Sequence, residues 1–166
     1  LQFSFHEEAD VAIGVCSPAR HEETGALWSD TRVRLTTSLH SIGDLVATYA
    51  YPNTIIETTP QGQILSFDPN FFEGSIREYL PNGRDRIMLI GPCYRTDIVI
   101  HHGASGGPVA GPSGRVFAIN STGFDGTDDS YISRIDELFP LEIIIDEDER
   151  TTIQQLIQDG AVIVDS

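Results

Sequence analysis

The chain has few basic residues, only two cysteines and no long apolar run. It carries 10 Lys and Arg residues against 25 Asp and Glu residues, which gives a formal net charge of -15. Phosphate backbones are bound through clustered basic side chains, and the ten here form no block, so we expect no nucleic-acid partner. No apolar run is long enough to cross a bilayer, so we expect no membrane span.

Metal and cofactor sites are not expected either. Cys16 and Cys93 lack metal-type spacing and form one disulfide at most, a pairing that the sequence leaves open. The acidic stretches at 125–129 and 146–149 do not have the glycine and ligand spacing of a calcium loop, so we interpret them as solvated. The chain begins at Leu1 without a basic-then-apolar leader, and we expect any targeting segment or upstream domain to have been removed.

The remaining composition is that of an ordinary soluble protein rich in strand patterns. With 166 residues, of which 40% are hydrophobic, the chain is long enough for one sizeable core or two small packed units. Pro-x-Gly turns recur at 60–62, 81–83 and 112–114, as in hairpins. Strands are expected at 1–5, 11–15, 32–39, 42–51, 63–67, 74–79, 86–90, 97–101, 109–110, 115–121 and 161–164. Many short strands with such turns predict an all-β sandwich or barrel.

Helical spacing is found only near the C-terminus. Ile135, Leu138 and Phe139 follow residues 130–133 at helical intervals, which predicts one short helix. Residues 151–157 form a second short amphipathic turn, with Gly160 in C-cap position. We therefore expect an all-β chain with short C-terminal helices.

The most specific feature is the loop at 103–109, which reads Gly-Ala-Ser-Gly-Gly-Pro-Val and centres on Ser105. A serine hydroxyl is a weak nucleophile that needs a base and donors for the oxyanion that forms on the substrate. Gly103 lets its own amide and that of Ser105 point at one spot. The alternative to a catalytic serine is a purely structural glycine-rich hairpin with an incidental serine. An α/β-hydrolase is disfavoured, because there a helix and a histidine follow the serine, whereas here Pro108 and a β-type stretch follow.

The run from 103 to 119 closely resembles the nucleophile loop of trypsin-like serine peptidases, in the bacterial branch that includes the HtrA-like enzymes. In that family the loop leads into a hairpin and a strand ending near Ser-x-Gly, as Ser121 to Gly123 do here. Residues 41–52 are similar to the opening of the family's second barrel, with Ala50 where glycine is usual. Residues 9–13, Ala-Asp-Val-Ala-Ile, resemble the family's Asp-Ile-Ala-Leu segment.

The resemblance implies a trypsin-like double β-barrel that hydrolyses peptide bonds through an acyl-enzyme on Ser105, with a protein or peptide as substrate. Gly103 and Ser105 would supply the oxyanion-hole amides, and Asp10 would orient the catalytic histidine. Val99, six residues before the serine, would line the base of the primary specificity pocket, where an apolar residue argues against cleavage after Arg or Lys. The remaining substrate-binding residues implied are His102, Ser121 and Gly123.

The histidine of such a triad has no good candidate in the sequence. The family order is His, Asp, Ser, and only nine residues precede Asp10. His6 is too close to Asp10 in sequence, His21 lies in a polar loop, His40 lies in the expected linker, and 101–102 precede the oxyanion glycine. We expect an N-terminal segment or a second chain to supply the histidine and the rest of the first barrel. The alternative is a pseudopeptidase that binds peptides.

The sequence also predicts how the chain is divided. Residues 1–40 would be the end of the first barrel and a linker, 41–129 the second barrel with the nucleophile loop, and 130–166 a C-terminal helix and acidic tail.

Overall fold

The computed structural model describes residues 2–15, 20–27, 32–52, 54–100, 103–123, 129–145 and 149–165. Nearly all of the elements are strands, and the only helices among the described residues are the 3-10 turn η1 (Ile135–Leu138) and the short helix α1 (Ile153–Gln158). The all-β expectation is therefore confirmed. The strands are β1 (Gln2–Phe5), β2 (Ala12–Val15), β3 (Arg34–Thr36), β4 (Leu45–Ala50), β5 (Ile55–Thr59), β6 (Gly62–Ser66), β7 (Asn70–Leu80), β8 (Cys93–Thr96), β9 (Pro108–Ala110), β10 (Val116–Gly123), β11 (Ser130–Arg134), β12 (Glu142–Ile144), β13 (Arg150–Thr152) and β14 (Ile163–Asp165).

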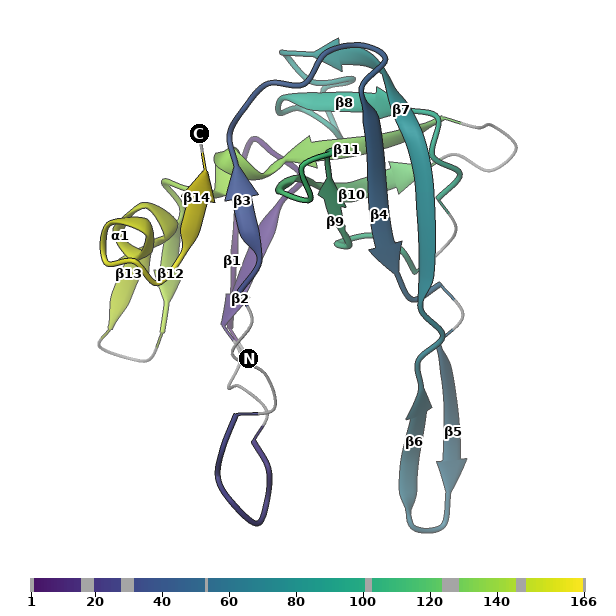
Figure 1. The fold of residues 1–166 in the computed structure, drawn as a ribbon, viewed down its shortest axis with the longest axis vertical. Coiled ribbons are helices and arrows are strands. Elements are labelled where there is room, and N and C mark those ends of the chain that lie inside the picture. The colour runs from purple at the N-terminus through teal and green to yellow at the C-terminus, as the bar shows by residue number, and fades with distance from the viewer. Residues whose placement is uncertain are drawn as a thin grey trace.

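Six of these strands close into an antiparallel barrel, which forms the upper part of Figure 1. Its order is β11-β8-β7-β4-β9-β10, and β10 pairs back onto β11. All six strands contribute to one buried cluster, which consists of Val46, Ile76, Tyr94, Ile98, Val109, Phe117, Ala118 and Ile132. Closure leaves no free edge among the six strands, and burial of these side chains is the main favourable term in its stability.

The hairpin of β1 and β2 packs beside the barrel. Ala9 and Val11, which flank its turn residue Asp10, are buried in a second cluster with Val116, Ile135 and Leu138. Because both neighbours of Asp10 are fixed in this cluster, the hairpin turn is held against the barrel wall. The position of the Asp10 carboxylate therefore follows from apolar packing.

The C-terminal strand is attached to the barrel through β3. β14 pairs parallel with β3, which pairs parallel with β10 (Figure 1). The Asp165 carboxylate accepts two hydrogen bonds from Arg34, at 2.6 and 2.7 Å, and one from Arg115 at 2.5 Å. The hydrogen bonds from Arg34, which have the largest effect, and from Arg115 lower the pKa of Asp165 well below its usual range.

Two strand predictions between β7 and β9 are wrong. The strand there is β8 at Cys93–Thr96, whereas 86–90 and the described part of 97–101 form no strand. The Asp85 carboxylate instead accepts the amides of Ile87 at 2.8 Å and Met88 at 2.7 Å, which folds that segment into a turn. The hydrogen bond from the Met88 amide, which has the largest effect, and that from the Ile87 amide lower the pKa of Asp85.

The helical spacing that begins at Ile135 is confirmed as a single turn, whereas the residues that lead into it form a strand. Residues 130–134 form β11, and only 135–138 turn, as one 3-10 turn. Both faces of β11 are covered, because Ile132 packs in the barrel core while Tyr131 packs with Leu89 and Cys93, so its sequence lacks the alternation of a half-exposed strand. The second helical prediction is confirmed, since α1 is followed by Gly160 at φ +72°.

One hairpin projects far from the barrel. Among the described strands, β5 and β6 pair only with each other, and they extend away from the ends of β4 and β7 (Figure 1). All but one of the residues in the two strands are exposed. The sequence predicted β6 and its turn at 60–62, where Gly62 has φ +136°.

Candidate active site

The loop that carries Ser105 is fixed by backbone hydrogen bonds to β10. The amide of Gly106 donates to the carbonyl of Asn120, and the amide of Asn120 donates to the carbonyl of Gly107, both at 2.8 Å. Gly103 and Gly106 adopt φ of +87° and +84°, which favours glycine at both positions. Ala104 is buried beneath the loop, so the loop is anchored while Ser105 is exposed.

A buried polar pair supports this loop from inside the barrel. The Asn120 amide nitrogen donates to the Thr48 hydroxyl at 2.7 Å and to the carbonyl of Ala104 at 3.3 Å. The Thr48 hydroxyl donates in turn to the carbonyl of Pro108 at 2.8 Å. Neither residue was predicted from the sequence as part of the site. A signal existed for Thr48, which is in phase with the core-facing Val46 and Ala50 along β4.

Asp10 and Ser105 are joined through Ser121. The Ser121 hydroxyl donates to the Asp10 carboxylate, and the Ser105 hydroxyl donates to the backbone carbonyl of Ser121 at 3.0 Å. The three residues come from the β1–β2 turn, the nucleophile loop and β10. The sequence predicted Ser121 only as a substrate-binding residue, and its contact with Asp10 was not foreseen.

These residues line one cavity of about 380 Å³. Its wall includes Asp10, Ser105 and Ser121, together with His6 and Phe5. The His6 ring nitrogen Nδ1 accepts the amide of Glu8 at 3.1 Å, so that nitrogen is occupied locally. A serine hydroxyl and a carboxylate that share a cavity provide two of the three groups that an acyl-transfer triad needs.

The other described histidines lie elsewhere. His40 stacks on Phe117 with 4.0 Å between ring centroids, and its Nδ1 is 3.4 Å from the Asp44 carboxylate. His21 lies in the exposed turn between residues 20 and 27. His102, predicted at the substrate groove, lies outside the described residues, as does His101.

Val99 and Gly123 do not line this cavity. The Val99 side chain is 46% exposed. At Gly123, an added Cβ would lie 3.2 Å from the carbonyl oxygen of Ile100, so the end of β10 approaches the segment before the nucleophile loop closely. Their roles in substrate binding stay predictions.

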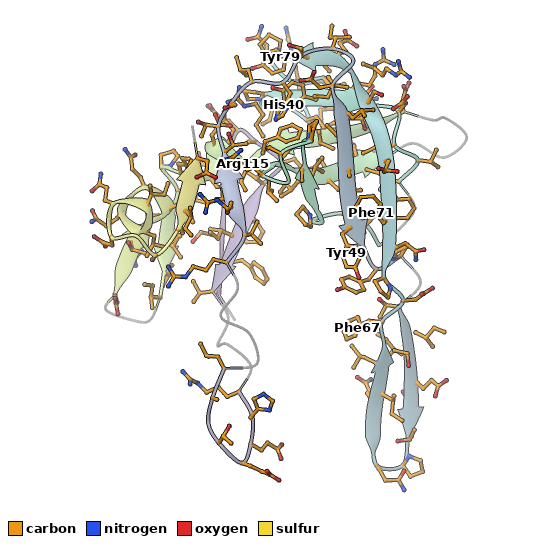
Figure 2. All side chains as sticks on the ribbon, in the orientation of Figure 1. His40, Tyr49, Phe67, Phe71, Tyr79 and Arg115 are labelled. Carbon is orange, nitrogen blue, oxygen red and sulfur yellow. The ribbon has the colours of Figure 1, made fainter. Side chains whose placement is uncertain are left out.

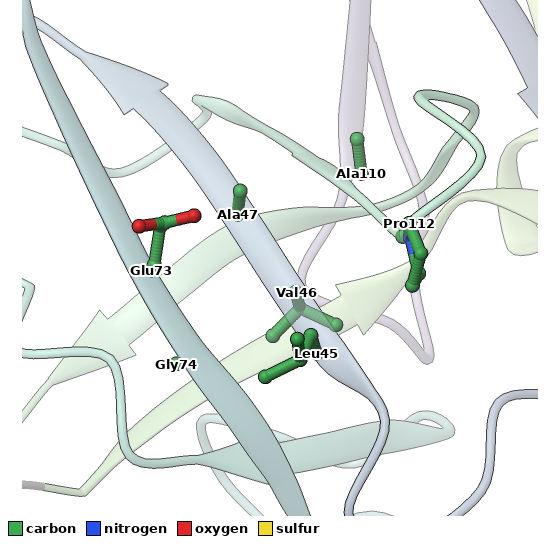
Figure 3. A pocket seen from close by; sticks show the side chains of 8 residues that line it. Leu45, Val46, Ala47, Glu73, Gly74, Ala110 and Pro112 are labelled. Carbon is green, nitrogen blue, oxygen red and sulfur yellow. The ribbon is translucent and has the colours of Figure 1, made fainter.

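A second hollow, of about 420 Å³, lies on β4 and β7 near the end of β9 (Figure 3). Its lining is mostly apolar, with Leu45, Ala47 and Ala110, and Glu73 is its one carboxylate. It contains none of the predicted site residues, so we place the candidate active site at Ser105.

Other kinds of site find no support in the part of the chain that the structure describes. Within it, no three His, Cys, Asp or Glu side chains group as metal ligands would. No helix among these residues has the length and apolar character of a membrane span. Cys93 is a buried free thiol whose pKa is raised by burial to about 11, and Cys16 lies outside the described residues.

Comparisons with known proteins agree with this fold. Neither a protein-family model nor a curated protein matches the chain. Among solved structures, the inactive form of Rv3671c from M. tuberculosis H37Rv, a serine-to-alanine mutant, is 17% identical with a TM-score of 0.50 over 81% of this chain and 56% of that chain. The active form of the Rv3671c protease is 18% identical with a TM-score of 0.51 over 68% of this chain and 46% of that chain.

The chain therefore has the fold of trypsin-like serine proteases. Identities this low establish the fold alone. The chain spans about half the length of the solved structures it matches.

Proposed function

We propose that this chain is the nucleophile half of a serine endopeptidase of the bacterial, HtrA-like branch, which cleaves peptide bonds through an acyl-enzyme on Ser105. The observation that carries the proposal is the shared cavity of Asp10 and Ser105, two residues far apart in the sequence that Ser121 bridges. An incidental glycine-rich turn gives no reason for a carboxylate to lie in the same cavity.

In this mechanism the Ser105 hydroxyl attacks the carbonyl carbon of the scissile bond and loses its proton to an imidazole. Asp10 holds that imidazole in the required tautomer and stabilises its charged form. The Ser121 hydroxyl, which donates to Asp10, orients the carboxylate. The amides of Gly103 and Ser105 hold the oxyanion, the amine leaves with the proton, and water then hydrolyses the ester on Ser105.

The imidazole belongs, in this proposal, to an N-terminal segment or a second chain that completes the first barrel. The cavity between Asp10 and Ser105 has room for such a ring. On β1, Phe3 and Phe5 are exposed large apolar side chains, which suits a hairpin that receives further strands. The substrate is a protein or peptide, and Val99 in the primary pocket favours bonds that do not follow Arg or Lys.

A pseudopeptidase that binds peptides is the second candidate. One observation favours it: among the described residues, the Ser105 hydroxyl bonds a backbone carbonyl and not a base. A fluorophosphonate probe separates the two functions, because it reacts only with an activated serine.

The test uses the full-length protein, including any residues encoded before Leu1, with Ser105→Ala as the control and mass spectrometry to locate the label. Labelling of Ser105 supports the peptidase. A folded protein, by circular dichroism, that stays unlabelled supports the binding module and refutes the peptidase.

A further inference from the structure

An exposed apolar strip runs from the nucleophile loop onto the projecting hairpin of β5 and β6. We propose that this strip binds an extended, apolar segment of the polypeptide substrate while the bond to be cleaved lies at Ser105. The inference rests on the proposed function, whose substrate class it narrows. The strip consists of Tyr49, Tyr51, Ile56, Leu65, Phe67 and Phe71.

The strip is continuous along its length. Tyr49 and Phe71 are direct partners in the β4–β7 pairing, and Tyr49 contacts Tyr51 edge-on at 5.5 Å between centroids. Tyr51 contacts Phe67 in the same way at 5.6 Å. Figure 2 shows Phe71, Tyr49 and Phe67 in this order of descent from the barrel toward the hairpin.

Ile56 and Leu65 extend the strip along one face of the hairpin. They are direct partners in the β5–β6 pairing and so project from the same face. The exposed fractions along the whole strip are 44% for Tyr49, 43% for Tyr51, 60% for Ile56, 50% for Leu65, 62% for Phe67 and 62% for Phe71. Contiguous apolar surface of this kind marks interaction sites in soluble proteins.

The inner end of the strip forms part of the support of the nucleophile loop. A Cβ added at Gly107 would lie 3.1 Å from the carbonyl oxygen of Tyr49, and one added at Gly103 would lie 3.7 Å from that of Tyr51. The backbone of the strip therefore lies close to the loop on both sides of Ser105. In the proposal, a polypeptide with one bond at Ser105 continues along the strip.

The hairpin also offers backbone groups for an extended partner. β5 and β6 form a two-stranded sheet, and within the described chain their outer edges have no strand partner. A polypeptide segment can add to such an edge as a third strand, with alternate side chains on the strip face. Between 55 and 66 the only charged residue is Glu57, whereas the chain carries a net charge of -15, so an acidic segment is disfavoured and an apolar one favoured.

Two other occupants fit less well. A second copy of the chain brings the same net charge of -15, which opposes association. A membrane would have to accept the tip of the hairpin first, where Thr58, Thr59, Gln61 and Gln63 are polar.

The test is peptide binding to the intact protein carrying Ser105→Ala, measured by fluorescence anisotropy. The probe is a fluorescein-labelled peptide of about twelve residues with alternating Val and Thr and a Lys at each end. Its matched peptide has Ser at every Val position and the same charge. The strip variant is Ile56→Thr/Leu65→Thr, and the matched control is Ile55→Thr/Ile64→Thr, which also replaces two exposed apolar residues by threonine but on the opposite face.

We expect the strip variant to weaken binding of the Val peptide at least about tenfold and the control to change it less than about twofold. Equal affinity in the strip variant, equal loss in the control, or equal binding of the Ser peptide would overturn the proposal. So would light scattering that shows a dimer which the strip variant makes monomeric, or strip-dependent binding to phosphatidylglycerol vesicles.

The two proposals fail separately. Intact strip-dependent binding with no fluorophosphonate label on Ser105 refutes the peptidase and leaves a peptide-binding surface. A labelled Ser105 without strip-dependent binding refutes the strip alone.

Discussion

Thr48→Val removes the buried hydroxyl that links β4 to Pro108, at the end of the Ser105 loop, and to Asn120 of β10. Valine has nearly the same shape, so the substitution opens no cavity and isolates the hydrogen bonds. Thr48 is 2% exposed and makes two of them, at 2.7 Å with Asn120 and at 2.8 Å with Pro108. At about 0.5–1.5 kcal/mol for each net hydrogen bond, the expected loss of unfolding free energy is about 1–3 kcal/mol.

Equilibrium urea unfolding followed by far-UV circular dichroism measures this loss. Thr58→Val is the matched control, because Thr58 is an exposed strand residue on the projecting hairpin and we expect its change to stay within about 0.5 kcal/mol. Labelling of Ser105 by a fluorophosphonate should slow in Thr48→Val and not in Thr58→Val. A Thr48→Val protein as stable as its Thr58→Val counterpart would refute the view that the Thr48–Asn120 pair holds the loop.

Three further predictions concern the glycine turn, the Asp10 contact and the C-terminal strand. Gly103→Ala and Gly25→Ala both place a side chain at positive φ, +87° and +67°, so each should lower the unfolding free energy by about 1–2 kcal/mol. Only Gly103→Ala should also slow fluorophosphonate labelling of Ser105. Equal slowing in both variants would contradict the proposed role of the Gly103 amide in the oxyanion hole. Ser121→Ala should slow labelling about tenfold by releasing the Asp10 carboxylate, whereas Thr122→Ala, whose hydroxyl bonds only the carbonyl of Gly123 in the described structure, should not. Asp165 has a pKa lowered by Arg34 and Arg115, so its stabilising effect is complete above the unfolded pKa of about 3.9 and is lost as the pH falls through and below that value. Thermal melts should therefore show Asp165→Asn less stable than the parent at pH near 7 and converging with it in acid, with Asp159→Asn as the control; a difference independent of pH would exclude the ion pairs as its cause.

The sequence predicted those features that depend on local chemistry. The turn glycines at 62, 83 and 114 all have positive φ, as does Gly160 at the end of α1. Backbone at positive φ favours glycine, so glycines in a turn pattern indicate where such turns occur. The Ser105 loop was recognisable for the same reason. Its small residues leave few alternatives for the backbone. The side chains of Asn120 and Thr48 support the loop from β10 and β4, and only the β4 sequence shows the alternation that identifies Thr48 as core-facing.

Features that depend on tertiary pairing could not be predicted. β11 has buried residues on both faces because the barrel core covers Ile132 and the cluster of Leu89 and Cys93 covers Tyr131, so its sequence shows neither alternation nor a strand boundary. The strand predicted at 86–90 failed because the Asp85 carboxylate takes up amides that a ladder would need. The parallel pairing of β14 with β3 joins Asp165 to Arg34 across almost the whole chain, and no local pattern indicates it.

The proposed peptidase mechanism requires a covalent acyl intermediate on Ser105. Intact-mass spectrometry of the full-length protein, mixed with a p-nitrophenyl ester of a short apolar peptide, measures this within one turnover. We predict an acyl adduct on Ser105 that forms, decays with time and is absent in Ser105→Ala. A folded full-length protein that shows no adduct on Ser105 would contradict the proposed acyl-enzyme.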